Sequence, residues 1–273
     1  MKTVSYSPEF IEAIKLAKEK GLFLGTGNPN ANILFLGKEA AIDKEKSAQQ
    51  HEREFLKNIA DWDYNNSTNN QFTHIDNWIT SPSPIFNSLY PYKGQRNTIN
   101  RKKTVQNQII YNGGTSKTWY NYQKIIDAIY FNNIPSNLIN FHEYAFCSEL
   151  NQETGRYSND IPKNKRANSI EKRKELFDKP FFKEFPITIV AVGHYVRDFD
   201  IDLQDIFKKT FHEALSQEHS QGLKSEYLNI HFDNPEKPTQ LLIHTNQLSM
   251  VSNELIRKLG EVCTLFLNGK INL

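Results

Sequence analysis

The chain has 273 residues, of which 38% are apolar, and its 33 Lys and Arg nearly balance 31 Asp and Glu, leaving a net charge of +2. This apolar fraction excludes an intrinsically disordered chain, and no apolar run approaches the roughly 20 residues that cross a bilayer. So small a net charge leaves any attraction for a polyanion to local clusters of basic residues. We therefore expect a single globular domain over residues 1–273 that contacts no membrane.

The cysteine content and the first residues indicate the cellular compartment. Two cysteines, Cys147 and Cys263, are too few for a disulfide framework. Residues 1–20 lack an apolar core followed by a small-residue cleavage site. We expect a reducing, cytoplasmic setting.

The first half of the chain predicts two helices, one strand and a long loop. Ser7 and Pro8 are typical of a helix start and Gly21 of a helix end. A buried strand is expected at 32–36 and a helix with a solvated face at 43–58. Residues 61–115 show little periodicity and predict a long loop insertion, which in compact domains is functional or mobile. Its aromatic residues line a pocket or, as is commoner, pin the loop to the core; they are Trp62, Tyr64, Phe72, Trp78, Phe86, Tyr90 and Tyr92.

The second half predicts alternating strands and helices. An apolar stripe after Ser116 indicates a helix, and the basic stretch 151–174 indicates a solvated face or, alternatively, a phosphate-contacting patch. The remaining expected elements are strands at 138–146 and 187–193, a helix at 202–219, a strand pair at 227–232 and 240–244, and a last helix at 249–267.

This alternation predicts an α/β fold of three layers, α/β/α, with a central, mostly parallel sheet of four strands. In such sheets ligands bind beyond the carboxyl ends of the strands. The side chains expected at that edge are Glu39, Glu143, His194 and His244.

Several motifs that mark common catalytic sites are absent from the chain. The chain has no Gly-x-x-x-x-Gly-Lys-Ser/Thr loop, no Cys-x-x-Cys or His-x-x-x-His spacing, and no Gly-x-Ser-x-Gly elbow. Two cysteines cannot supply the four thiolates of an iron–sulfur cluster. We therefore expect neither a metal nor a cofactor.

Three short segments resemble, in the same order, the three site segments of the uracil-DNA glycosylase superfamily, and the single-strand-selective uracil glycosylases look nearest. The segments are Gly37-Lys38-Glu39-Ala40-Ala41, Phe141-His142-Glu143-Tyr144 and His244-Thr245-Asn246-Gln247-Leu248-Ser249. The resemblance implies a DNA glycosylase of base-excision DNA repair that hydrolyses the N-glycosidic bond of a flipped, damaged or deaminated base. It implies a monomer whose partner is single- or double-stranded DNA or another nucleobase-containing ligand.

The resemblance also implies roles for individual residues. Glu39 takes the place of the residue that positions a water, and His244 that of the histidine that supports the departing base. Glu143 is aligned with the asparagine that reads the base edge, and Leu248 with the leucine that fills the gap in the duplex. The remaining residues implied in substrate binding are Gly37, Lys38, His142, Asn246 and Ser249.

The chemistry of the reaction suits these residue types. Breaking an N-glycosidic bond leaves positive charge on the sugar and negative charge on the base, so a carboxylate and a hydrogen-bond donor act where charge develops. The base must first leave the stack and enter a pocket. An ionised Glu143 only accepts hydrogen bonds, so it suits a base with two donors on one edge, unless its pocket raises its pKa and keeps it protonated.

Each assignment has a structural alternative. Glu39 can pair with a neighbouring lysine or cap a helix, His244 can be a buried histidine bonded to the backbone, and Leu248 can be a core residue. Glu143 can face solvent from an edge strand, and His142 and His194 can be structural. Two other functions stay open: a protein of the same fold that binds a base or nucleic acid without cleavage, and a hydrolase of free nucleosides. The roles assigned to Glu39, Glu143 and His244 require that these three side chains meet around one cavity.

Overall fold

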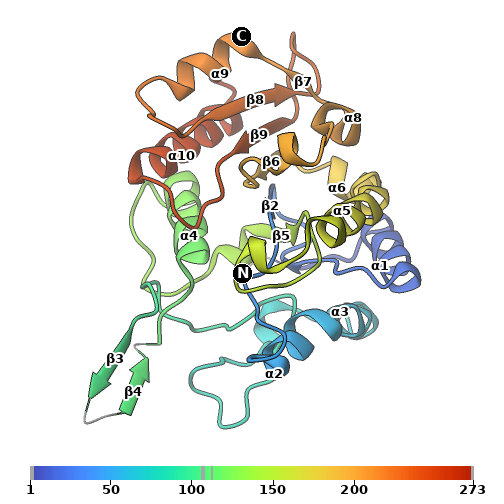
Figure 1. Cartoon of the computed structure of the whole chain (residues 1–273), viewed down its shortest axis with the longest axis vertical. Helices are drawn as coiled ribbons and strands as arrows, with labels where there is room; N and C mark the ends of the chain where they lie inside the picture. The colour runs from blue at the N-terminus through green and yellow to red at the C-terminus, as the bar shows by residue number, and fades with distance from the viewer. Residues whose placement is uncertain (1–2, 106–107, 112, 272–273) are drawn as a thin grey trace.

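One mixed β-sheet runs through the molecule. The structure is a computed structural model that describes residues 3–105, 108–111 and 113–271. Within these residues the sheet has seven strands in the order β1-β5-β2-β6-β9-β8-β7 (Figure 1). The strands are β1 (Thr26–Gly27), β2 (Ile33–Gly37), β5 (Ala145–Glu149), β6 (Ile187–Val190), β7 (Thr210–Phe211), β8 (Leu228–Phe232) and β9 (Leu241–Thr245).

The middle of the sheet is parallel and its edges are antiparallel. Strands β5, β2, β6 and β9 pair in parallel, whereas β1 pairs with β5, β8 with β9 and β7 with β8 in antiparallel fashion. The predicted α/β class is confirmed, but the predicted four-stranded sheet is wrong, because three antiparallel strands extend it. Two of these, β1 and β7, are only two residues long and carry no periodic signal in the sequence.

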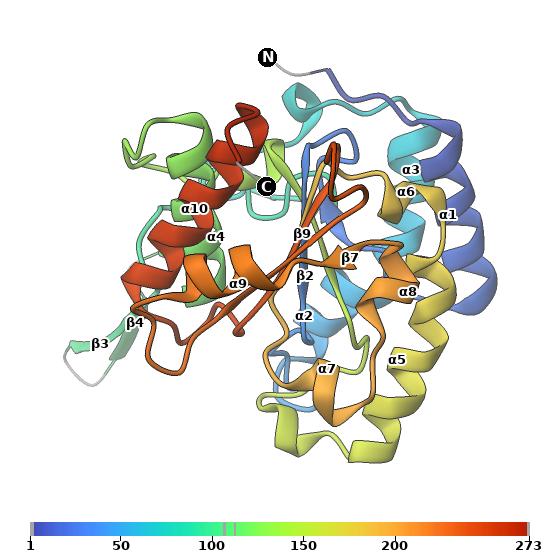
Figure 2. The ribbon, with the colours of Figure 1, turned by 90° about the horizontal axis from the view of Figure 1, so that it is seen from above.

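Helices cover both faces of the sheet, as seen from above in Figure 2. One buried cluster joins α4 and α10 to Phe35 and Ile189, and a second joins α1, α5 and α6 to Leu34 and Val190. The helices of eight or more residues are α1 (Pro8–Lys20), α3 (Asn58–Ser67), α4 (Lys117–Tyr130), α5 (Lys163–Phe177), α9 (Glu213–Ser220) and α10 (Asn253–Leu267). The shorter helices are α2 (Ala48–His51), α6 (Pro180–Lys183), α7 (Tyr195–Asp198) and α8 (Leu203–Phe207). No helix in the described residues is long and apolar enough to span a membrane.

The first helix forms where its end signals place it. The Ser7 hydroxyl accepts a hydrogen bond from the amide of Phe10 at 3.2 Å, which satisfies one free donor of the first turn. Gly21 ends the helix in the left-handed region, with φ of 63°. The predicted helix is therefore confirmed.

The next predicted helix, at 43–58, is wrong in extent. The chain forms the short helix α2, a π-helical turn η1 (Glu52–Leu56) and then α3, which enters the expected loop. Trp62 holds α3 in place, since it is fully buried and donates to the carbonyl of Gly25 at 2.8 Å. Further along, β3 (Lys102–Val105) and β4 (Gln108–Tyr111) form a hairpin that projects from the body (Figure 1). The segment 61–115 is thus only partly loop.

Two later elements also differ from the prediction. The strand expected at 138–146 is a 3₁₀ turn η3 (Phe141–Glu143) followed by β5, so the strand starts and ends later in the chain. The helix expected at 202–219 is divided into α8 and α9, because Lys208 adopts a left-handed conformation with φ of 54°. Both segments carry buried apolar residues, and the helical period alone did not separate them.

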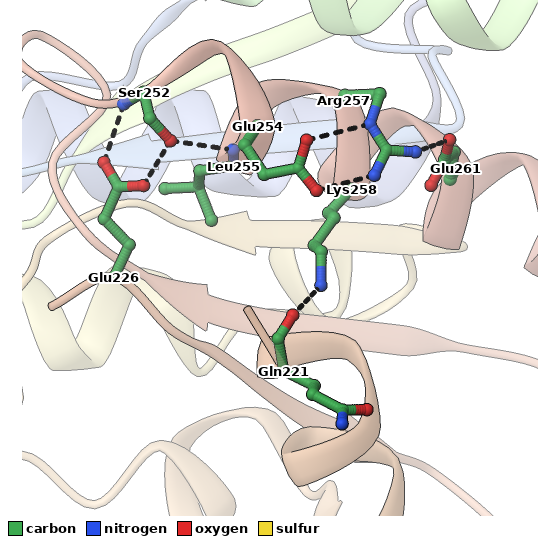
Figure 3. Close-up of polar contacts among 8 residues, drawn as sticks. All are labelled: Gln221, Glu226, Ser252, Glu254, Leu255, Arg257, Lys258 and Glu261. Atoms are coloured by element: carbon green, nitrogen blue, oxygen red, sulfur yellow. Dashed lines mark hydrogen bonds and ion pairs between the residues drawn. The ribbon is translucent and has the colours of Figure 1, made fainter. Parts of the chain in front are cut away.

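The start of α10 is anchored by a polar cluster (Figure 3). Ser252 caps the helix by accepting from the amide of Leu255 at 3.1 Å, and the carboxylate of Glu226 accepts from the Ser252 amide at 2.7 Å. Arg257, one turn further, pairs with Glu254 and Glu261 on the outer face. These contacts fix the end of the loop that leads from β9 into α10.

Candidate active site

A cavity of about 630 Å³ opens at the carboxyl ends of β2 and β5. From β2 the chain moves to β5 on one side and then returns to β6 on the other, so a topological switch point lies at this edge. The lining includes the turn after β2, the loops after β5 and β9, the start of α4 and part of the segment 77–126. Its polar or charged members include Lys38, Glu39, Glu54, Gln95, Thr115, Glu149, Arg156, Ser158 and Ser249.

Glu39 lies where the loops after three strands meet. Its carboxylate accepts hydrogen bonds from Tyr195 at 2.5 Å, from Asn151 at 3.3 Å and from the hydroxyl of Ser158. Asn151 is in reach because its amide donates to the carbonyl of Lys38 at 2.7 Å, which continues the β2–β5 pairing past the strand ends. Accepting from three donors is the pattern of a carboxylate held in one orientation.

Glu149 is the carboxyl group beside Glu39 where β2 and β5 end, and it is not among the site residues expected from the sequence. It ends β5 directly opposite Gly37, and a Cβ atom at Gly37 would collide with its Oε2 atom. Burial raises the pKa of Glu149 to about 8, the nearby charge of Glu39 adds to this, and Arg173 opposes it. At neutral pH Glu149 is therefore mostly protonated and can donate a hydrogen bond, unlike an ionised carboxylate.

Gly37 gives a test of this arrangement. Gly37→Ala is expected to push the Glu149 carboxyl group aside while leaving the fold intact, because the colliding atom is the far end of a flexible side chain. We expect a midpoint of thermal unfolding within about 4 °C of the wild type, a loss of about 1 kcal/mol, and loss of the titration near pH 8 in the NMR spectrum of the Glu149 side chain. An unchanged titration would contradict the packing of Glu149 on Gly37.

Arg173 supports the end of β5 from the other face of the sheet. It is fully buried, and its guanidinium donates to the Glu149 carbonyl at 2.7 Å, to the Ser148 hydroxyl at 2.8 Å and to the Phe23 carbonyl. Burial lowers the pKa of Arg173 to about 9, so it remains cationic at neutral pH. This residue lies in the basic stretch 151–174, whose other basic residues are exposed or only partly buried.

Aromatic side chains make the cavity wall on the α4 side. Tyr122 stacks on Phe35 with ring centroids 4.1 Å apart, and Trp119, one turn earlier in α4, lies 6.0 Å from the ring of Tyr92. Tyr92 is held by the carboxylate of Glu54 and by Arg53, which donates to its hydroxyl at 2.7 Å. The faces of these rings offer stacking surfaces to a planar ligand.

Two of the predicted site residues lie at the wrong edge of the sheet. Glu143 and His142 belong to η3, which precedes β5, whereas Glu39 follows β2, and β2 and β5 run parallel. The first and last residues of β5 are four steps apart, so the two edges are separated by about 13 Å at 3.3 Å per step. His142 is fully buried behind Trp119, with ring centroids 4.7 Å apart, and burial lowers its pKa to about 3. The predicted convergence of Glu39, Glu143 and His244 is therefore wrong for Glu143.

His244 lies close to the cavity but is not among the residues that line it. Its Nε2 atom is 2.9 Å from the Gly193 carbonyl oxygen, so this nitrogen carries the proton and donates, and Nδ1 faces the Asn229 amide at 3.4 Å. Burial lowers the pKa of His244. The ring therefore supports the loop after β6, as in the structural interpretation, and His194 in that loop is exposed.

The remaining candidates divide into two groups. Gly37, Lys38, Leu248 and Ser249 line the cavity with Glu39. The Lys38 ammonium lies 4.6 Å from the centre of the Tyr195 ring, and burial lowers its pKa. Leu248 is 1% exposed and belongs to the core, so it does not project as a wedge, whereas Met250 of the same loop is 87% exposed.

Asn246 makes a structural hydrogen bond within the fold. Its side-chain oxygen accepts from the amide of Tyr227 at 3.0 Å, which joins the end of β9 to the segment before β8. It is not among the residues that line the cavity.

Besides Glu149, the site contains Tyr195, Ser158 and Asn151, none of which the sequence analysis proposed. One signal was present for Glu149: it follows the apolar run Ala145-Phe146-Cys147 as Glu39 follows its own strand. No comparable signal marks the other three, because they reach Glu39 only through tertiary contacts.

Comparison with protein-family models, with curated proteins and with solved structures finds no match to this chain. Among residues 3–105, 108–111 and 113–271, no three His, Cys, Asp or Glu side chains gather in an arrangement suited to a metal ion.

Proposed function

We propose that the protein hydrolyses the N-glycosidic bond of a base that enters the cavity at the carboxyl edge of the sheet. The observation that carries the proposal is the pair of carboxyl groups at the ends of β2 and β5 in that cavity: Glu39, which accepts three hydrogen bonds, and Glu149, whose pKa is raised to about 8. A carboxyl group that is held protonated beside a second carboxyl group is typical of an acid paired with a base or nucleophile.

The two groups match the charges that develop in the reaction. The carboxylate of Glu39 stabilises the positive sugar or orients the attacking water, and the protonated Glu149 donates to the departing base, where negative charge appears. In this proposal Glu149, which lies beside the first site turn, replaces both Glu143 and His244 of the sequence-based assignment. A protonated carboxyl group carries one hydrogen-bond donor and one acceptor, whereas an ionised glutamate only accepts. The protonated Glu149 can therefore also pair with a base such as uracil, whose edge presents both a donor and an acceptor.

We propose DNA, single- or double-stranded, as the substrate and a uracil-DNA glycosylase-like fold acting as a monomer. Support comes from residues 77–126, which contain seven Lys and Arg and no Asp or Glu in a chain with 31 acidic residues. This segment contributes Tyr92, Trp119 and Tyr122 to the cavity wall and includes the β3–β4 hairpin. Local positive charge of this kind attracts a phosphate backbone even when the net charge is small. Cys147 and Cys263 are free and buried, which fits the cytoplasmic location that we propose.

Base release from oligonucleotides tests the proposal. We expect release from single strands that carry hypoxanthine, xanthine, uracil or an alkylated base, with a rate that falls as the pH rises through about 8, because Glu149 loses its proton there. Glu149→Gln is expected to lower the rate and to remove this alkaline limb.

Glu143→Gln is the matched control. Glu143 is also a glutamate, but it lies in η3, just before β5, at the opposite edge of the sheet from Glu149. Its rate and pH profile are expected to equal those of the wild type. Loss of activity in Glu143→Gln, with Glu149→Gln unaffected, would restore the sequence-based assignment.

The alternative function is base or nucleic-acid binding without cleavage. One observation favours it: the donor of His244 points to the Gly193 carbonyl rather than to the cavity. Oligonucleotide binding without any release, in wild type and variants alike, is the result expected for this alternative.

A further inference from the structure

Several polar atoms near the Trp119 end of the cavity are buried and lack a hydrogen-bond partner within the described part of the chain. They are Oε1 of Gln95, Oγ1 of Thr115 and both ring nitrogens of His142. Gln95 and Thr115 themselves line the cavity, and Thr115 is 1% exposed. An unsatisfied buried polar atom is unfavourable for the folded state, so its presence in a cavity wall calls for an explanation.

Gln95 and Thr115 form one continuous polar edge. The Gln95 side-chain amide nitrogen donates to the carbonyl of Gly114 at 2.9 Å, so this side chain reaches the residue directly before Thr115. The Gln95 backbone amide donates to the Tyr92 carbonyl at 3.0 Å, so the same segment also sets the position of the Tyr92 ring. The edge therefore offers one acceptor, Oε1, and one hydroxyl that donates or accepts, near the rings of Tyr92 and Trp119.

The edge formed by Gln95 and Thr115 lies at the start of α4, where Thr115 directly precedes the N-cap Ser116. Glu149 acts electrostatically on Tyr122, and Trp119 and Ser116 lie three and six residues before Tyr122. At 1.5 Å per residue, Tyr122 and Ser116 are about 9 Å apart along the helix. That span exceeds what a single six-membered ring fills and suits a fused two-ring base.

We infer that Gln95 and Thr115 form a specificity subsite that reads the far edge of a purine-type base, an inference that rests on the proposed function. The base lies along the α4 wall with its sugar end towards Glu149 and Glu39. Its edge presents an N–H group to Oε1 of Gln95 and an acceptor to the hydroxyl of Thr115, as the N1–H and O6 atoms of hypoxanthine do. Both protein atoms are closed to solvent, so a neighbouring side chain turns aside when the base binds.

Thr115→Val separates this role from a structural one. Valine has nearly the same shape as threonine and removes a hydroxyl that has no partner, so we expect an unchanged or higher midpoint of thermal unfolding. Affinity for free hypoxanthine, measured by calorimetry, is expected to fall about tenfold, the loss of one hydrogen bond. The wild type is expected to bind 1-methylhypoxanthine about tenfold more weakly than hypoxanthine, because the methyl group replaces the N1–H donor.

Thr188→Val is the matched control. Thr188 is another fully buried threonine with an unpartnered hydroxyl, but it lies in β6 and is not among the residues that line the cavity. This variant is expected to leave the affinity for hypoxanthine unchanged.

Three results overturn the inference: a Thr115→Val variant that binds hypoxanthine as tightly as the wild type, a marked fall in its unfolding midpoint, or equal binding of uracil and hypoxanthine by the wild type. Failure of the proposed function is a different result, in which hypoxanthine binds as expected but no oligonucleotide releases a base.

Discussion

Replacing Glu39 by glutamine is expected to lower the rate of base release by about 10³-fold. Glutamine keeps the shape of the side chain but loses the negative charge that faces the developing positive charge of the sugar. Its amide nitrogen would also face a hydrogen-bond donor, since Tyr195, Ser158 and Asn151 all donate to Glu39. Single-turnover release from an oligonucleotide, with substrate binding measured separately, distinguishes a loss in the chemical step from a loss of affinity.

Glu45→Gln provides the control for this variant. Glu45 follows β2 in the same loop but is exposed, and its rate is expected to match the wild type. A Glu39→Gln protein that folds normally and releases base at more than a tenth of the wild-type rate would show that the carboxylate is not the reacting group.

Replacing Arg173 by methionine is expected to lower the free energy of unfolding by about 3–5 kcal/mol. The guanidinium is fully buried and satisfies three acceptors, the carbonyls of Glu149 and Phe23 and the hydroxyl of Ser148. Without it these oxygens lose their charged donor, and β5 loses its link to α5 and to the segment before β1. Urea denaturation followed by circular dichroism measures the loss.

The same change should affect the acid group of the site. Arg173 lowers the pKa of Glu149, so its removal is expected to move the alkaline limb of the rate profile to a pH above about 8. Lys172→Met, at an exposed neighbouring position of α5, is expected to change neither stability nor pH profile. A loss of less than about 1 kcal/mol in Arg173→Met would mean that water replaces the guanidinium.

Local signals predicted several elements well. The caps of α1 at Ser7 and Gly21 depend on residues that contact only their own turn, so sequence reasoning finds them. The antiparallel pair β8 and β9 was likewise expected, since two apolar runs flank an Asp-Asn-Pro turn. The edge strands β1 and β7 escaped prediction because two residues carry no period.

The position of β5 illustrates why the site was only half predicted. Residues 138–149 are rich in apolar side chains, and a strand buried on both faces shows no alternation that would fix where it begins. The strand was therefore expected to start seven residues and to end three residues before its actual bounds. That displacement exchanged Glu149, at the carboxyl edge, for Glu143, at the amino edge.

The sequence by itself determined the α/β class, the ends of α1 and the placement of Glu39 directly after a buried strand. Only the tertiary structure decided which side chains surround Glu39: Asn151 and Tyr195 are 112 and 156 residues away in the chain. It also decided that Glu149 lies against Gly37 and that the proton of His244 faces Gly193. The physical reason is that helix caps and strand periods are short-range properties. Strand register, burial and the resulting protonation of a carboxyl group depend on contacts between distant segments.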